Sequence, residues 1–172
     1  MSAQPRGALV VTTPSDRDIV MTRTFAAPPS LVWECMTTPT LVRRWLLGPP
    51  GWEMPVCEID LRPGGSYRYL WRHPDGREFG MGGSFHEIAP PHRLVSTERF
   101  GDGEASVVHR LTESAGRTTL TLSMGFADRT ARDGALKTGM TDGVEMSYQR
   151  LDAILTRPPI SEPSTMTGSK AS

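Results

Sequence analysis

The sequence predicts an α+β domain in which a curved antiparallel sheet of about seven strands wraps around one long carboxy-terminal helix. Two observations predict this fold. Residues 54–126 consist of strand-like segments separated by turns rich in glycine, proline and aspartate. Residues 135–155 instead carry apolar side chains three or four positions apart, which is typical of a helix with one buried face. A continuous sheet of this size would curl, and one long helix is its natural cover.

The expected elements follow one another in a simple order. Residues 18–25 are rich in β-branched side chains and predict a first strand. Residues 27–37 and 38–47 predict two short helices, and the Gly-Pro-Pro-Gly corner at 48–51 ends the second one. Six further strands are expected over residues 54–61, 66–71, 77–88, 93–100, 105–114 and 117–126. Gly139 and Gly143 weaken the final helix.

Length and composition predict a single domain over residues 16–156 of the 172-residue chain. Residues 1–15 and 157–172 are rich in Ser, Thr, Pro and Gly, and we expect both segments to be disordered tails. The formal net charge is zero, which argues against partners such as nucleic acid or an anionic membrane.

The chain shows no sign of export, metal binding or a familiar cofactor. No apolar run is long enough for a signal-peptide core or a membrane span, so we expect a cytoplasmic protein. Cys35 and Cys57 are expected to be buried reduced thiols in that compartment. There is no CxxC pair, Walker loop, GxSxG elbow or dinucleotide GxGxxG, so we expect neither a metal nor a cofactor.

Strand alternation places aromatic side chains on one face of the predicted sheet. Tyr67, Tyr69 and Trp71 share a face that we expect to point inward. The following strand carries a similar face, made of Phe79, Met81 and Phe85. These side chains are either ordinary core or the wall of a ligand pocket. Buried tyrosine hydroxyls need polar partners, which a ligand could provide.

Three polar residues are candidates for chemistry. His109 shares a strand face with Val107 and Leu111, so it is predicted to enter the core as a satisfied core histidine, a general base or a ligand anchor. Glu98 and Arg99 face opposite ways, and strand alternation leaves open which of them is internal. An internal Glu98 would suit acid–base chemistry, whereas an internal Arg99 would favour an anionic ligand.

The rigid decapeptide 43–52 places two tryptophans at the corner that follows the second short helix. We expect Trp45 to pack as core beneath this corner and Trp52 to form the rim of a pocket, held still by the prolines. The expected ligand-binding residues are Trp52, Tyr67, Tyr69, Trp71, Phe79, Met81, Phe85, His109, Met140, Val144 and Tyr148.

Five stretches of the chain resemble a known family. They are RTFAAPPSLVWECMTTPTLVRRWLLGPPGW, DLRPGG, FHEIAPPHRLVSTERF, TGMTDG and YQRLDAIL, in this order between residues 18 and 155. They resemble bacterial homologues of the activator of the heat-shock-protein-90 ATPase, in the START-like (SRPBCC) superfamily. The resemblance implies the helix-grip fold. Family members usually carry tryptophan where this chain has Val144, which implies a larger or differently shaped cavity here.

Three hypotheses for function follow. The first is binding of a hydrophobic or aromatic small molecule between sheet and helix, for carriage, sensing or sequestration. The second is a cofactor-independent cyclase, dehydratase or hydrolase of an aromatic or polyketide-like substrate, with His109 or Glu98 as acid–base. The third, which only the resemblance suggests, is a module that stimulates a chaperone ATPase. A monomer and a homodimer that pairs sheet edges are both compatible with the sequence.

Overall fold

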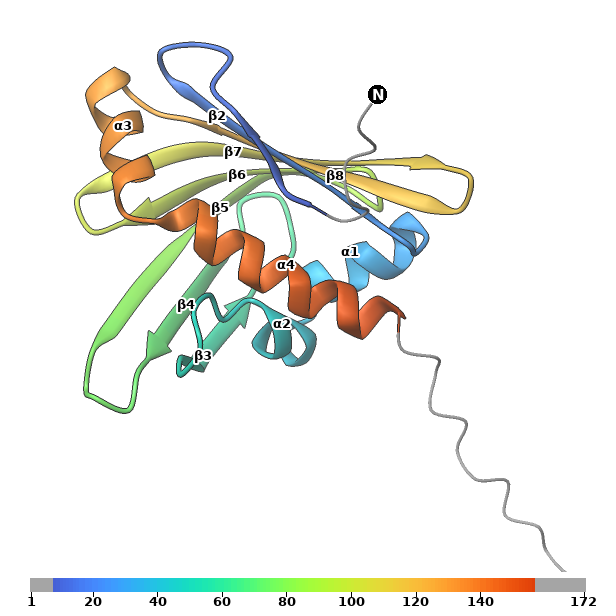
Figure 1. Ribbon diagram of the computed structural model, residues 1–172, viewed down its shortest axis with the longest axis horizontal. Coiled ribbons are helices and arrows are strands. Elements are labelled where there is room, and N and C mark those ends of the chain that lie inside the picture. The colour runs from blue at the N-terminus through green and yellow to red at the C-terminus, as the bar shows by residue number, and fades with distance from the viewer. Residues whose placement is uncertain (1–7, 157–172) are drawn as a thin grey trace, which may run out of the picture.

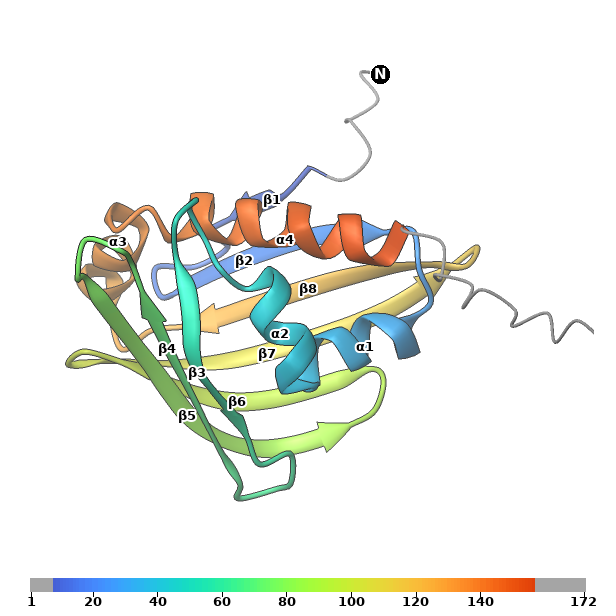
Figure 2. The ribbon, with the colours of Figure 1, turned by 90° about the horizontal axis from the view of Figure 1, so that it is seen from below.

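The computed structural model describes residues 8–156. Its eight strands form one curved, unclosed antiparallel sheet in the order β1-β2-β8-β7-β6-β5-β4-β3 (Figures 1 and 2). The strands are β1 (Val10–Thr12), β2 (Asp18–Phe25), β3 (Glu53–Ile59), β4 (Ser66–Arg72), β5 (Glu78–Ala89), β6 (Arg93–Phe100), β7 (Gly103–Ser114) and β8 (Arg117–Gly125). The helices are α1 (Pro29–Thr37), α2 (Pro39–Trp45), α3 (Arg129–Lys137) and α4 (Met140–Thr156).

The predicted α+β helix-grip architecture is confirmed. The seven expected strands form where the alternating pattern placed them, and the two short helices follow β2. The eight residues of β2 pair with β8 without interruption, from Asp18 opposite Gly125 to Phe25 opposite Thr118. Every second side chain of these two strands is buried, because only one face of the sheet carries the helix.

Two expectations differ from the structure. Val10–Thr12 form β1, although residues 1–15 were expected to be disordered; residues 1–7 and the expected tail 157–172 lie outside the described residues. The long helix expected over 135–155 is two helices, α3 and α4, separated at Gly139. Gly139 has φ of 78°, a left-handed conformation that ends α3 and that glycine adopts without strain.

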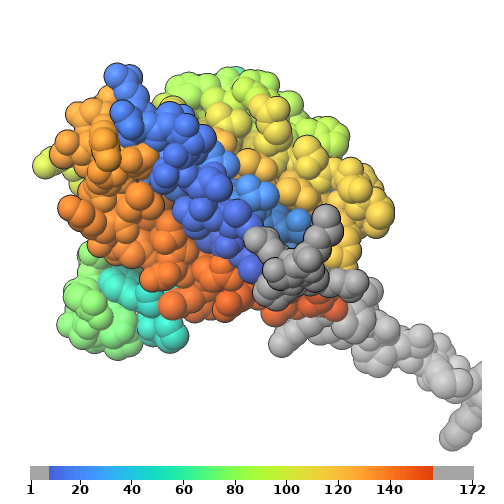
Figure 3. Space-filling model, turned by 45° about the horizontal axis from the view of Figure 1, so that its top comes forward, coloured from blue at the N-terminus to red at the C-terminus, as the bar shows by residue number. Residues whose placement is uncertain are grey.

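Helix α4 lies along the concave side of the sheet, with α1 and α2 beside its carboxy-terminal half (Figure 2). The amino-terminal segment at the edge of the sheet runs alongside α4 (Figure 3). The backbone N–H of Leu9, which precedes β1, donates to Oε2 of Glu145 at 2.9 Å. The Gly-Pro-Pro-Gly corner reaches α4 from the other side, since the N–H of Gly48 donates to Oγ of Ser147 at 2.9 Å. Contacts on both sides therefore fix the position of α4 over the sheet.

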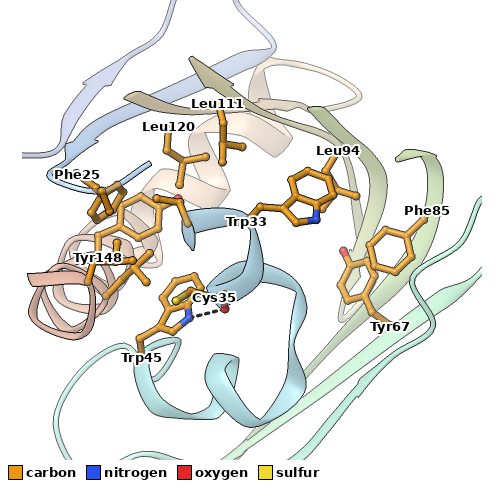
Figure 4. Packing of buried hydrophobic residues seen from close by; sticks show 14 residues of the cluster. Phe25, Trp33, Cys35, Trp45, Tyr67, Phe85, Leu94, Leu111, Leu120 and Tyr148 are labelled. Atoms are coloured by element: carbon orange, nitrogen blue, oxygen red, sulfur yellow. Dashed lines mark hydrogen bonds between the residues drawn. The ribbon is translucent and has the colours of Figure 1, made fainter. Parts of the chain in front are cut away.

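The main hydrophobic core lies between the carboxy-terminal half of α4, α1 and the middle of the sheet (Figure 4). Phe25, Leu111, Leu120 and Leu151 are almost completely buried there. Trp45 is also buried, as expected, and its indole N–H donates to the carbonyl of Cys35 at 2.9 Å. Both expected thiols, Cys35 and Cys57, are buried and free. None of the described helices is long and apolar enough to cross a membrane.

Candidate functional site

A cavity of about 650 Å³ lies between the concave face of the sheet and the amino-terminal half of α4. Strands β4 to β8 supply one wall, and Met140, Gly143 and Val144 of α4 supply the other. The segment after α2, from Leu46 to Pro49, closes the space between them. The Gly48–Ser147 hydrogen bond holds this segment against α4, so the cavity has a fixed boundary on that side.

Aromatic rings form a continuous wall on β4 and β5. The ring of Tyr67 lies 5.2 Å from Phe85 and 5.3 Å from Tyr69, measured between ring centroids. Tyr69 is 5.8 Å from Trp71, which in turn is 5.6 Å from Phe79. The wall is anchored at Trp71, whose indole N–H donates to the carbonyl of Leu46 at 2.7 Å. These rings therefore present a rigid apolar surface to the cavity.

The exposed residues of the cavity lining mark its rim. Phe79 is 48% exposed, and Pro49, Leu61, Arg77, Thr138 and Gly139 are also exposed. They belong to the Gly-Pro-Pro-Gly corner, the β3–β4 turn, the β4–β5 hairpin and the junction of α3 and α4 (Figure 1).

Trp52 joins the corner to the β4–β5 hairpin. Its ring packs edge-on against His73 at 5.3 Å, and the guanidinium of Arg77 lies over it at 5.3 Å. Nε of Arg77 also donates to Oδ2 of Asp75 at 2.7 Å, so that cation is held on the hairpin. Trp52 lines the cavity beside the exposed Arg77, and its role as the rim of a ligand pocket stays a prediction.

Glu98 is the internal member of the Glu98–Arg99 pair. It lies on β6 on the same face as the buried residues Leu94 and Ser96, and it lines the cavity. Arg99 lies on the outer face, where its Nε donates to Oε2 of Glu104 at 3.1 Å. Burial raises the pKa of Glu98 from its ordinary value of 4.5 to about 7. Near neutral pH this carboxyl group is therefore poised between its two protonation states.

His109 enters the cavity from β7, as its strand face predicted. Its Nδ1 is buried and has no hydrogen-bond partner among the described residues. Burial lowers the pKa of His109 from 6.5 to about 4, so the imidazole is neutral at pH 7. The residue as a whole is nevertheless only partly buried, and it borders the cavity. A neutral imidazole of this kind can donate or accept one hydrogen bond from a ligand.

The tyrosines of the cavity are neutral phenols. Burial raises the pKa of Tyr67, Tyr69 and Tyr148, and the nearby charge of Glu98 raises it further for Tyr67 and Tyr69. The hydroxyl of Tyr67 donates to the carbonyl of Thr97 at 3.4 Å, a long hydrogen bond. These hydroxyl groups are suited to orienting a ligand rather than to taking its proton.

The two ionisable candidates lie too far apart to act as a directly bonded pair. His109 is opposite Leu94 in the register of β6 and β7, and Glu98 is four residues along β6 from Leu94. With a rise near 3.3 Å per residue, their backbones are separated by roughly 13 Å. Between residues 8 and 156, no group of three His, Cys, Asp or Glu side chains could hold a metal ion. Glu98 and His109 therefore offer two separate polar points on an apolar wall.

All of the residues predicted to bind a ligand line this one cavity: Trp52, Tyr67, Tyr69, Trp71, Phe79, Met81, Phe85, His109, Met140, Val144 and Tyr148. Their role in binding stays a prediction. The sequence analysis did not assign several other wall residues to the site, namely Met36, Leu46, Leu47, Ser96, Phe100, Val107, Leu122 and Met124. Strand alternation had already placed Val107 on the face of His109, and alternation from Glu98 could have found Ser96 and Phe100 in the same way.

Comparison with known proteins agrees with this architecture. A family model described as Activator of Hsp90 ATPase homolog 1-like protein matches residues 26–156. No curated protein matches the chain.

Several solved structures are similar to this chain. A protein from Rhodobacter sphaeroides is 32% identical, with 86% of this chain and 97% of that chain covered and a TM-score of 0.81. A protein from Mycobacterium smegmatis is 26% identical, with 87% and 99% covered and a TM-score of 0.76. One from Nitrosomonas europaea is 26% identical, with 83% and 96% covered and a TM-score of 0.75. The chain belongs to the Activator of Hsp90 ATPase homolog 1-like family, within the START-like superfamily.

Proposed function

We propose that this protein binds a hydrophobic or aromatic small molecule in the cavity between the sheet and α4, as a carrier, sensor or sequestering protein. The observation that carries this proposal is the cavity of about 650 Å³ with its aromatic wall. Small-molecule sites are concave, largely apolar and typically of roughly 300–1,000 Å³, with a few placed polar groups. This cavity meets each of those conditions.

The expected affinity comes mainly from apolar contact. A bicyclic aromatic molecule that lies along Tyr67, Tyr69 and Trp71 would have most of its apolar surface removed from contact with water. At about 25 cal/mol per Å² of buried apolar area, less the cost of association, we expect a dissociation constant on the order of 10 μM. The tyrosine hydroxyls and His109 would then select among ligands by their polar groups.

The binding proposal is tested by titration with N-phenyl-1-naphthylamine, an apolar dye whose fluorescence rises in apolar surroundings. Val144→Trp places an indole in the cavity and is expected to weaken dye binding by about tenfold or more, since it removes space the dye needs. Met146→Trp is the matched control, because Met146 lies on the exposed side of the same helix. Absence of saturable binding to the unaltered protein, or equal binding by both variants, would count against the proposal.

A cofactor-independent enzyme that uses the same cavity is the second candidate. The observation that favours it is that a carboxyl group and an imidazole, Glu98 and His109, both line the apolar cavity. Burial raises the pKa of Glu98 to about 7, which suits acid–base chemistry near neutral pH. A screen of aromatic and polyketide-like substrates by mass spectrometry tests it. Turnover should be lost in His109→Ala or Glu98→Gln and kept in His92→Ala, an exposed histidine outside the cavity. Turnover that survives both cavity substitutions would contradict this candidate.

The chaperone-stimulating role stays a prediction from family resemblance.

A further inference from the structure

We propose, on the basis of the function proposed above, that the ligand is an aromatic amine whose protonated nitrogen binds the carboxylate of Glu98 while its apolar body lies along the β4–β5 aromatic wall. The proposal depends on where Glu98 stands, on which charges surround it and on the rings beside it.

The neighbours of Glu98 leave its carboxyl group open to the cavity. In the register of the sheet, Glu98 is opposite Gly83 on β5 and Ala105 on β7, so neither flanking side chain covers it. Tyr67 takes up the space above Gly83, since a Cβ at that glycine would lie 2.8 Å from two atoms of the tyrosine ring. The carboxyl group therefore stands beside the start of the aromatic wall.

Glu98 has no partner of its own. It makes no hydrogen bond or ion pair with any residue between 8 and 156, and its oxygens are not among the buried atoms without a partner in that region. They therefore keep surface that is accessible from the cavity, which Glu98 lines. A ligand group that donates hydrogen bonds would give this carboxyl group a partner.

No cation of the described chain faces Glu98. The cavity lining contains one basic side chain that is charged at pH 7, Arg77, which is held at the rim by Asp75 and Trp52. Arg99 lies on the opposite face of the sheet and pairs with Glu104. His109 is neutral and far along the strand, and α4 contributes Met140, Gly143 and Val144, which carry no charge. A positive charge that pairs with Glu98 would therefore have to come from the ligand.

The surroundings of Glu98 favour a protonated amine over an acid or an alcohol. The faces of Tyr67, Tyr69 and Trp71 attract a cation, and this attraction strengthens when water is excluded. A charge-assisted hydrogen bond to a carboxylate is stronger than a neutral one, whereas an anionic ligand would be repelled. Burial holds the pKa of Glu98 at about 7, so below neutral pH the carboxyl group is mostly protonated. Binding of the amine at such a pH requires that Glu98 first loses its proton.

Three probes with the same naphthalene ring test the proposal by calorimetry: 2-(2-naphthyl)ethylamine, 2-(2-naphthyl)ethanol and the anion of 2-naphthaleneacetic acid, called the acetate below. At about pH 8 we expect the amine to bind about tenfold more tightly than the alcohol, and the acetate to bind most weakly. Glu98→Gln should weaken amine binding by about tenfold and leave alcohol binding within about twofold. Glu104→Gln, a change on the outer face, should alter neither.

The pH dependence supplies a second readout that uses the unaltered protein. Between about pH 8 and pH 6 the amine should lose about tenfold in affinity as Glu98 takes up its proton, while the alcohol should not change. Alcohol binding with no preference for the amine, or an amine preference that persists in Glu98→Gln, would overturn this inference while leaving the proposed function intact. Failure of all three probes and of N-phenyl-1-naphthylamine would overturn the proposed function itself.

Discussion

The two halves of α4 cover the same sheet face in opposite ways. In the carboxy-terminal half, Leu151 and Leu155 are buried in the same core cluster as Phe25 and Leu120, and none of these four residues lines the cavity. Tyr148 lies beside Phe25 in this cluster (Figure 4). In the amino-terminal half the inward positions are only partly buried and border the cavity. Tyr148 closes the boundary, with its ring 5.7 Å from Phe25 and 6.0 Å from Trp45.

The difference shows that side-chain volume on one helix positions the cavity. Met140, Gly143 and Val144 are smaller or less deeply inserted than the residues that follow them. A tryptophan in place of Val144 would fill part of this space. The packed half stabilises the fold, and the hollow half leaves apolar surface for a ligand.

The largest expected effect contrasts the two halves directly. Leu151→Ala should destabilise the protein by about 2–5 kcal/mol, because a completely buried leucine leaves a cavity in a packed core. Val144→Ala should cost less than about 1 kcal/mol, since that side chain already borders open space. Urea unfolding of the two variants measures both values. Equal losses would contradict the distinction between a packed and a hollow half.

Glu98→Gln should change how stability depends on pH. The folded pKa of Glu98, about 7, lies above its ordinary value of 4.5, so the folded state holds the proton more tightly. This contribution is complete below about pH 4.5 and is lost as the pH rises through about 7. We therefore expect the variant to gain about 2 kcal/mol relative to the unaltered protein between pH 5 and pH 8, allowing for partial exposure to the cavity.

The difference between the two proteins isolates Glu98. The lowered pKa of His109 has the opposite effect, because it makes the protein less stable as the pH falls below about 6.5, but it is common to both proteins. Chemical unfolding of the variant and of the unaltered protein measures the free energy of unfolding of each as a function of pH. Two parallel curves between pH 5 and pH 8 would contradict the claim that burial raises the pKa of Glu98.

The smallest effect concerns the junction at the rim. Gly139→Ala should cost about 1 kcal/mol, because φ at this position is in the left-handed region. Gly134→Ala, inside α3 with nothing within 4 Å of the added methyl group, should instead stabilise by about 0.5–1 kcal/mol. Thermal unfolding of the pair checks the sign of each change. Equal shifts of Tm would show that the break between α3 and α4 does not depend on this glycine.

Local patterns predicted most of the fold. The alternation in β2 and β4 and the prolines that begin α1 and α2 are local signals, and these elements form where they were expected. The short strand β1 was missed because its three residues have no strong pattern of their own and depend on pairing with β2. Gly139 indicated a weak point in the predicted helix, but the break itself was missed because the apolar spacing continues across this glycine.

The sequence predicted which strand faces point inward, but it did not predict the size or position of the cavity. Alternation placed Tyr67, Tyr69 and His109 on inward faces, and the structure brings them onto one cavity. The choice between Glu98 and Arg99 stayed open because both faces of that strand are mixed. The signal that could have decided it is the pair Leu94 and Phe100, which share the parity of Glu98. The hollow itself depends on how distant elements meet, which no local pattern records.

Native mass spectrometry of the protein purified from its own host tests the central claim most directly, by comparing its native and denatured masses. The account predicts an additional mass that leaves on denaturation and that is absent from Val144→Trp, in which the cavity is filled. Met146→Trp, on the outer side of the same helix, should retain that mass. A native mass equal to that of the bare chain in all three proteins would contradict the claim that the hollow half of α4 holds a small molecule.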